Sequence, residues 1–326
     1  MRKTGAEETW PLRKLRVGVS FLVMLCLIMG ACSDKKSTIP IDPGMSETDK
    51  DFLPAWSPDG KTVAYFTIIY DPVPFQTSLR TVSVDTDSIS IIRELGNLDV
   101  HGLDWSPDGE WLVFSSVLGL FKIRASGDSL IQLTHGDYHA FPSWSTSSNQ
   151  IFFAKNAGSE RGLYSMQPDG SSLHRWTWPD SFVVEGPSCF PTSDSLTIYT
   201  YRGAQYCLGI HHPGDTNISA ILECGFSWLE SSRMSPDASW IAFNANYSGD
   251  PESNLYLYNR TDQTLEKLNT KASEGMDFSP DGSQLVHADL GVVYDDPRLA
   301  DRRGSRGMQI ITLTDRSVRQ LTPGYH

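Results

Sequence analysis

Cysteine is scarce in this chain, basic residues are in the minority, and no apolar stretch is long. The 326 residues include 5 cysteines, 27 basic residues and 39 acidic residues. An uncharged apolar run from Val17 to Met29 has only 13 residues, whereas a helix that crosses a membrane needs about 20. An acidic surface repels phosphate backbones, so we do not expect a nucleic-acid partner.

The first 31 residues differ in kind from the rest. Five basic residues precede the apolar run, and Gly30, Ala31 and Cys32 follow it. This order predicts a secretory signal peptide over residues 1–31 rather than a domain. An uncleaved anchor helix is the alternative, which the short run disfavours.

The residues around the end of the run resemble the lipobox of bacterial lipoproteins, with Met29 in place of the usual leucine. The resemblance implies cleavage before Cys32, lipidation of Cys32 and a membrane anchor. Ser33 in the next position implies the periplasmic face of the outer membrane in a cell with two membranes. Without residues 1–31 the chain has 22 basic and 37 acidic residues, a net charge near −15, which suits cationic peptides or metal ions.

Three cysteines remain after signal cleavage and lipidation, namely Cys189, Cys207 and Cys224. Their spacing is not that of a zinc site. Folding about the turn near Pro213 places Cys207 opposite Leu222, so a Cys207–Cys224 disulfide needs a bulge or a shifted register. We therefore expect buried free thiols.

One short motif recurs six times. The copies are WSPDGKTVAYF, WSPDGEWLVF, WSTSSNQIFF, FPTSDSLTIY, MSPDASWIAF and FSPDGSQLVH, which begin at Trp56, Trp105, Trp144, Phe190, Met234 and Phe278. Neighbouring copies begin 39 to 49 residues apart, which is the length of a four-stranded propeller blade. The repeat predicts an all-β fold, a six-bladed β-propeller of four-stranded antiparallel blades.

Each repeat predicts the same order of strands. A first strand ends at the aromatic position, Ser-Pro-Asp-Gly turns the chain, and an apolar second strand follows. A hairpin of third and fourth strands completes the blade. Residues 51–326 are predicted to form the propeller domain, and residues 32–50 a polar tether behind the lipid. Blade 6 is expected to close the ring against blade 1 without a shared strand, unless the tether supplies one.

The WSPDG repeats resemble the TolB-like propeller family, with WD40-like repeats, over about residues 51–321. The resemblance implies a periplasmic protein that binds proteins or peptides, and we expect a monomer. Similar repeats form the propeller of prolyl oligopeptidase relatives. The chain lacks the Gly-x-Ser-x-Gly motif that the hydrolase domain of those enzymes needs, which excludes a peptidase.

The starts of the first strands differ between blades in an informative way. Four or five residues before the aromatic position, every repeat has a carboxylate or a histidine: Asp51, His101, His139, Glu185, Glu230 and Glu274. Around one mouth of a channel these side chains suit a divalent cation or a positively charged peptide end. The alternative is that strand starts are polar in any propeller, and then no ligand is implied. No other cofactor is expected.

Two insertions are candidate partner-binding loops. Residues 289–307 in blade 6 carry Arg298, Arg302, Arg303 and Arg306, and residues 69–78 in blade 1 carry Phe75. Loops longer than about 15 residues are often functional. Because blades 1 and 6 are neighbours in a closed ring, the two loops are expected to share one contact surface, with surface ornament as the alternative.

These patterns favour a non-catalytic, lipid-anchored envelope propeller that binds a protein or peptide. A metal-dependent polysaccharide lyase is a second possibility, for which His101 and His139 are the available ligands and no base can be identified. A binder of carbohydrates or small molecules is a third. Its candidate side chains are Trp176, Trp178, Trp228 and Tyr247, although aromatic residues also fill the space between blades.

Overall fold

The computed structural model describes residues 50–70, 74–136, 139–155, 160–176, 183–189, 193, 195–202, 205–212, 215, 219–247, 253–271, 273–289 and 307–322. The chain divides into two units, residues 1–40 and residues 41–326. All described residues belong to the second unit. The predicted signal peptide and Cys32 lie outside them.

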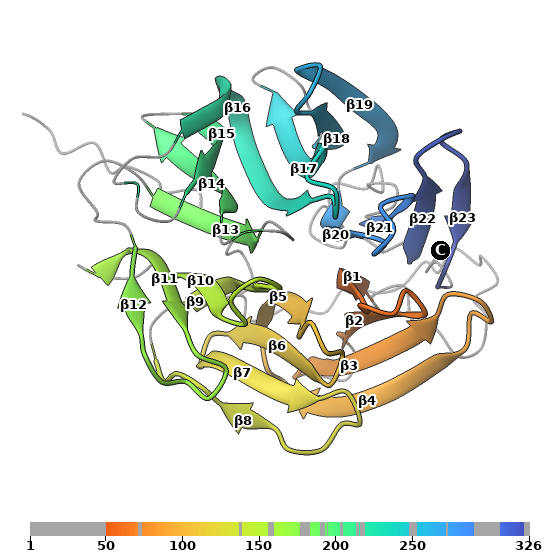
Figure 1. The fold of residues 1–326 in the computed structure, drawn as a ribbon. Coiled ribbons are helices and arrows are strands. Elements are labelled where there is room, and N and C mark those ends of the chain that lie inside the picture. The colour runs from red at the N-terminus through yellow and green to blue at the C-terminus, as the bar shows by residue number, and fades with distance from the viewer. Residues whose placement is uncertain are drawn as a thin grey trace, which may run out of the picture. The chain divides into compact units, whose positions relative to one another are not determined.

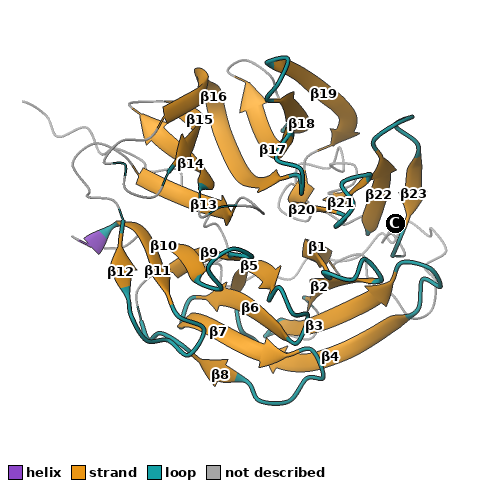
Figure 2. Cartoon of the chain, in the orientation of Figure 1, coloured by secondary structure: helices purple, strands orange, loops and turns teal. Residues whose placement is uncertain are grey.

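Antiparallel strands and short turns make up nearly all of the described residues (Figure 2). The first three sheets contain β1 (Lys50–Trp56), β2 (Thr62–Ile69), β3 (Gln76–Ser83) and β4 (Ile89–Gly96); β5 (Val100–Trp105), β6 (Trp111–Ser116), β7 (Gly119–Arg124) and β8 (Ile131–Gln132); and β9 (His139–Trp144), β10 (Ile151–Lys155), β11 (Gly162–Met166) and β12 (His174–Arg175).

The remaining strands form a sheet of seven and a sheet of four. The seven are β13 (Val183–Cys189), β14 (Leu196–Arg202), β15 (Gln205–His211), β16 (Ser219–Met234), β17 (Trp240–Tyr247), β18 (Asn254–Asn259) and β19 (Thr264–Lys271). The four are β20 (Ser273–Phe278), β21 (Gln284–Asp289), β22 (Met308–Thr312) and β23 (Val318–Gln320). The prediction of an all-β fold with antiparallel four-stranded sheets is confirmed.

The seven-stranded sheet arises because β16 is 16 residues long and serves two neighbours. Its first half, up to Phe226, pairs with β15, and its second half, from Phe226 onward, pairs with β17. The segment has no proline and only one glycine to turn the chain. Glu230 therefore lies inside β16 and does not start a strand, contrary to the sequence prediction. Five sheets are described, and six blades stay a prediction.

The first strands of the sheets contact one another in a closed cycle (Figure 1). Strand β1 contacts β5, β5 contacts β9, β9 contacts β13, β13 contacts β16, β16 contacts β20, and β20 contacts β1. The second strands pack on both faces, as the apolar pattern predicts. All of Val63, Ala64, Tyr65 and Phe66 in β2 are fully buried.

The sheets β1–β4 and β20–β23 meet where the cycle closes. They share no strand among the described residues. One core cluster contains Phe52 and Trp56 from the first sheet together with Ile310 and Leu321 from the last. On the outside, the Arg319 guanidinium lies 2.7 Å from the Asp87 carboxylate. Closure thus rests on packing of separate sheets, as the sequence predicts.

The Ser-Pro-Asp-Gly turns have the predicted mechanism. In the first copy, Asp59 accepts hydrogen bonds from the Ser57 hydroxyl and the Lys61 amide, and Gly60 has a φ of 74°. These hydrogen bonds lower the pKa of Asp59. The third copy keeps the turn without the motif, since the Ser145 amide donates to the Gln150 carbonyl as the Ser57 amide does to Thr62.

The expectation of buried free thiols is wrong for Cys207, which is disulfide-bonded, whereas Cys189 forms no disulfide and is half-buried. Strands β15 and β16 pair Tyr206 with Phe226 and Leu208 with Leu222, with a register shift between the two pairs. Residues 223–225 of β16 thus lie between these two pairs, opposite Cys207 alone, which is the kind of irregularity that a Cys207–Cys224 disulfide was expected to need. Among the described residues, no helix is long and apolar enough to cross a membrane.

Candidate functional site

Asp51 is the first of the predicted channel-mouth residues, and it is buried. Its carboxylate accepts hydrogen bonds from the Thr67 hydroxyl at 2.7 Å and the Thr322 hydroxyl at 2.8 Å. Thr322 also accepts a hydrogen bond from the Met308 amide at 2.8 Å. Asp51 therefore joins β1 to β2 and to the segment after β23, where the cycle of strands closes.

His101, in β5, lies partly exposed with its ring 3.7 Å from the Asp99 carboxylate. Burial lowers the pKa of the ring, while the negative charge of Asp99 raises it. Backbone pairing places His139 at the start of β9, Glu185 in β13 and Glu274 in β20. The structure does not describe the side chains of these three residues or of Glu230. No group of three histidine, cysteine or acidic residues that could hold a metal occurs in the described part of the chain.

A second set of residues occupies the position directly before the aromatic residue at the end of each first strand. None of them was a predicted channel-mouth or loop residue. We call this set the axial belt: Ala55, Asp104, Ser143, Cys189, Arg233 and Asp277. Each member comes from a different repeat. The six positions are equivalent in first strands that contact one another in a closed cycle.

Belt side chains connect each first strand to the next. The Trp144 amide donates to Asp104 at 2.7 Å, and the Cys189 amide donates to the Ser143 hydroxyl at 3.0 Å. The Trp56 amide donates to Asp277 at 2.7 Å, which connects β20 to β1. Carboxylate and hydroxyl oxygens of the belt thus accept hydrogen bonds from backbone amides that strand pairing does not use.

Arg233 crosses the cycle of strands. Its guanidinium donates to the Leu103 carbonyl at 3.2 Å, and its Nε lies 3.7 Å from a carboxylate oxygen of Asp277. Leu103 is in β5, which is three strands away from β16 in either direction around the cycle. Arg233 therefore bridges strands that lie on opposite sides of the cycle.

The belt holds two carboxylates and one guanidinium with little water. Burial raises the pKa of Asp277 to about 7, against a lowering by Arg233 and a further rise caused by Asp104. Burial also raises the pKa of Asp104. The Asp277 carboxyl has a pKa near 3.8 in the unfolded chain, so the native state holds the proton more tightly. The contribution of Asp277 to the free energy of unfolding therefore falls as the pH rises from about 4 to about 7.

Replacing Arg233 by methionine should raise the pKa of Asp277 further. The substitution removes the positive charge that favours the ionised carboxylate, and the apolar side chain keeps most of the packing. Carboxyl-carbon NMR of protein labelled at aspartate would follow the titration, with Asp277→Asn to identify the signal. An unchanged titration in Arg233→Met would show that the guanidinium does not act on Asp277.

Exposed apolar side chains occur at the end of the ring where the first strands begin. Strand pairing places the ends of β2 and β6 beside the starts of β1 and β5, since Ile68 pairs with Lys50 and Ser116 with Val100. Tyr70 follows β2 and is 37% exposed. Val117 and Leu118 follow β6 and are 42% and 54% exposed.

The predicted loop residue Phe75 is partly buried against the core and lies with its ring centroid 6.4 Å from that of Tyr70. The four candidate arginines, Arg298, Arg302, Arg303 and Arg306, are outside the described residues.

Two of the aromatic residues considered for carbohydrate binding, Trp176 and Tyr247, pack in separate places, and Trp178 lies outside the described residues. Trp176 packs on Phe152 and donates its indole hydrogen to the Ser165 hydroxyl. Tyr247 packs between Phe226 and Tyr256. Both fill space within or between sheets, which is the common role of aromatic residues in such folds.

Comparison with known proteins gives one similar sequence and many similar folds. No family model matches the chain. It is 28% identical over 238 residues to a TolB homologue of Chlorobium chlorochromatii, which covers 68% of this chain and 52% of that protein. The chain thus spans about half the length of the curated relative that it matches.

Two solved structures show the range of proteins with this fold. TolB from Acinetobacter baumannii superposes with a TM-score of 0.63 at 15% identity, covering 83% of this chain and 62% of that one. An oligogalacturonate lyase from Vibrio parahaemolyticus gives 0.52 at 13% identity, covering 86% and 80%. Both likenesses concern the fold alone. In sequence and in fold together, the chain is similar to the TolB-like propellers.

Proposed function

We propose that this protein is a non-catalytic, lipid-anchored propeller of the cell envelope that binds a protein or peptide partner at the end of the ring where the first strands begin. In this proposal the propeller has six blades, and β16 contributes to two of them. The cycle of six contacting first strands and the pairing of the two halves of β16 with different neighbours support that count.

The exposed apolar residues Tyr70, Val117 and Leu118 carry the proposal. They come from two turns at one end of the ring, near the start of β1 and the partly exposed His101 in β5. Apolar side chains with a polar border are typical of protein interfaces. In this proposal the rim residues His139, Glu185, Glu230 and Glu274 and the arginines of residues 289–307 extend the border, and a cationic partner segment suits the acidic part of it.

A non-catalytic role fits the chemistry of the belt. Each carboxylate of Asp104 and Asp277 accepts a backbone amide hydrogen from the next first strand. These contacts connect neighbouring first strands, which gives both carboxylates a structural role that needs no reaction. The similarity to a TolB homologue supports an envelope protein that binds other proteins.

An oxidising compartment fits the sulfur chemistry. Disulfides persist in secreted and periplasmic proteins and are rare in the cytosol. The disulfide at Cys207 therefore supports export, in line with the signal peptide predicted for residues 1–31 and the anchor predicted at Cys32.

Substituting Leu118 by aspartate should reduce capture of the partner about tenfold, because a charge in the apolar patch removes the contact and must be desolvated. Crosslinking in intact cells followed by mass spectrometry would measure the yield of the crosslinked partner. Val318→Asp is the matched control, since Val318 is 52% exposed in β23, away from this end of the ring. Equal loss in both variants, or in neither, would contradict docking at this patch.

The same cells test the anchor. After labelling of the cells with a radioactive fatty acid, the wild-type protein should carry the label and Cys32→Ser should not, because the lipid is attached through the Cys32 thiol. A wild-type protein without label, or equal labelling of both proteins, would contradict lipid anchoring and leave the patch experiment unaffected.

A further inference from the structure

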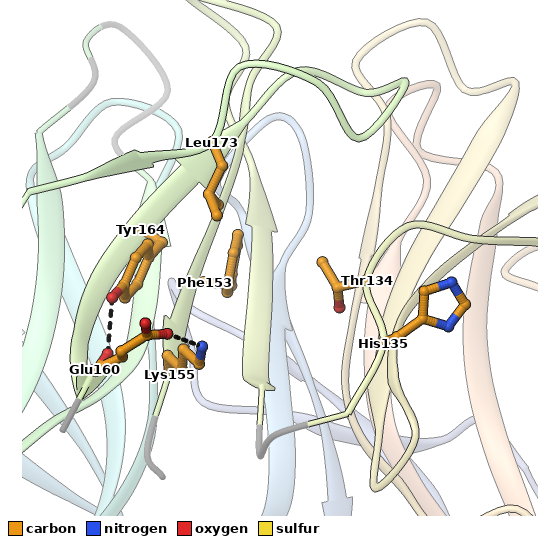
Figure 3. A pocket seen from close by; sticks show the side chains of 7 residues that line it. All are labelled: Thr134, His135, Phe153, Lys155, Glu160, Tyr164 and Leu173. Atoms are coloured by element: carbon orange, nitrogen blue, oxygen red, sulfur yellow. Dashed lines mark hydrogen bonds and ion pairs between the residues drawn. The ribbon is translucent and has the colours of Figure 1, made fainter. Parts of the chain in front are cut away.

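A pocket of about 180 Å³ opens between the chain after β8 and the sheet of β9–β12. Figure 3 shows its lining: Thr134, His135, Phe153, Lys155, Glu160, Tyr164 and Leu173. Strand β8 has only two residues, so the chain that follows it, with Thr134 and His135, forms the wall opposite β10 and β11. Pockets for drug-sized molecules have about 300–1,000 Å³, so this one holds roughly a single amino-acid residue.

One wall of the pocket is flat and apolar. The rings of Phe153 and Tyr164 stack with centroids 5.8 Å apart and an interplanar angle of 18°. The Tyr164 hydroxyl donates to the Glu160 carbonyl at 2.8 Å, which fixes the ring. Leu173 lies at the upper end in Figure 3 and is 62% exposed. An aliphatic or aromatic side chain can bury its surface here without any rearrangement of the wall.

The other end of the pocket is charged. The Lys155 ammonium is mostly buried, with the side chain 13% exposed, and pairs with the Glu160 carboxylate, whose side chain is 64% exposed. Arg175 adds a second cation, with its guanidinium 5.7 Å from the Tyr164 ring centroid and a hydrogen bond to the Arg161 carbonyl. Positive charge therefore gathers at this pocket in a chain whose net charge is −12.

The Glu160 carboxylate takes the position beside the Lys155 ammonium that the carboxylate of a ligand would take. A mostly buried ammonium needs a carboxylate partner because its desolvation is costly. An exposed glutamate gains little from such a pair, since side-chain entropy and water oppose it. The pair is therefore exchangeable: a ligand carboxylate can take the position of Glu160 while Glu160 turns to water.

We infer that this pocket binds a small apolar carboxylate, namely an aromatic or aliphatic side chain carried next to a free carboxylate, as at the C-terminus of a peptide. The side chain lies against Phe153 and Tyr164, and the carboxylate pairs with Lys155. The inference is independent of the partner patch at Tyr70, Val117 and Leu118, which uses other residues.

Titration of the full chain with N-acetyl-L-phenylalanine, followed by ligand-observed NMR, tests the inference. N-acetyl-L-phenylalaninamide, which lacks the carboxylate, should bind at least about tenfold more weakly, because one charge-assisted hydrogen bond is lost. Glu160→Gln should strengthen binding of the acid about tenfold by the same reasoning, since the ligand carboxylate then no longer competes with the Glu160 carboxylate for the Lys155 ammonium. Glu110→Gln is the matched control, because Glu110 is equally exposed and pairs with Arg124 elsewhere in the fold.

Two further variants keep the test independent of folding defects. Lys155→Met should abolish the preference for the acid over the amide, and Leu173→Ala, a change at an exposed side chain, should weaken both probes. Binding of the peptide Ala-Ala-Phe in addition identifies a peptide end as the source, and binding of N-acetyl-L-phenylalanine alone identifies a free small carboxylate. The inference is overturned if neither probe binds Glu160→Gln, or if the amide binds as tightly as the acid.

Discussion

Replacing Asp51 by alanine is expected to lower the free energy of unfolding by about 3 kcal/mol, because two buried threonine hydroxyls lose a charged acceptor. The Asp51 carboxylate accepts hydrogen bonds from Thr67 in β2 and from Thr322 after β23. The second bond joins residues 271 positions apart in the chain, so its loss weakens the closure between the first and last sheets. Urea unfolding of the purified protein measures the change.

Two variants locate the effect in the closure. Thr322→Val removes one of the two hydrogen bonds and should cost about 1–2 kcal/mol, and the Asp51→Asn/Thr322→Val double-mutant cycle gives the coupling between the partners. Asp85→Ala is the control, since Asp85 is exposed in the turn between β3 and β4 and should change stability by less than about 0.5 kcal/mol. If Asp51→Ala unfolds at the same urea concentration as Asp85→Ala, the Asp51 carboxylate does not stabilise the closure.

His287→Leu should stabilise the protein, and more so in acid. His287 in β21 is fully buried, and neither ring nitrogen has a hydrogen-bond partner among the described residues. Burial lowers the pKa of this ring to about 4, from 6.5 in the unfolded chain. The unfolded state therefore binds the proton first, and native stability is lost as the pH falls from about 6.5 to about 4.

The gain in the variant follows from that difference in pKa. At pH 5 the wild-type protein has lost about 2 kcal/mol through His287 relative to pH 7.5, and the leucine variant has not. Unfolding at the two pH values measures the difference, and comparing variants at each pH cancels the opposite contribution of Asp277. His135→Leu is the control, because that ring is exposed. Equal pH dependence in wild type and His287→Leu would contradict the prediction.

Local patterns predicted the strands and turns well because the forces involved are local. Pro, Asp and Gly at fixed offsets determine the turn after each first strand, as at Asp59 and Gly60. The apolar second strands predicted burial on both faces, and β2 confirms it. The recurrence of the motif predicted separate antiparallel sheets.

The same patterns failed where two distant segments decide the outcome. Nothing in the residues between Phe226 and Met234 ends a strand, so β16 continues from one neighbour to the next. The disulfide at Cys207 depends on a register shift between β15 and β16. For Asp51 the channel mouth stays a prediction, and one of its two threonine partners, Thr322, could not be predicted because it lies 271 positions away in the chain.

The axial belt shows most clearly what was not predictable. The residue before each aromatic position was visible in every repeat, yet no prediction was made for Asp104 and Asp277, because their partners are backbone amides that leave no mark in the sequence. Likewise, no spacing connects Arg233 to Leu103, 130 residues away.

The sequence by itself determined the strand order, the turns and the repeat, because each rests on interactions between residues close together in the chain. The tertiary structure alone decided which carboxylates close the ring, which cation bridges it and where apolar side chains remain exposed, because these depend on contacts between sheets that are far apart in sequence.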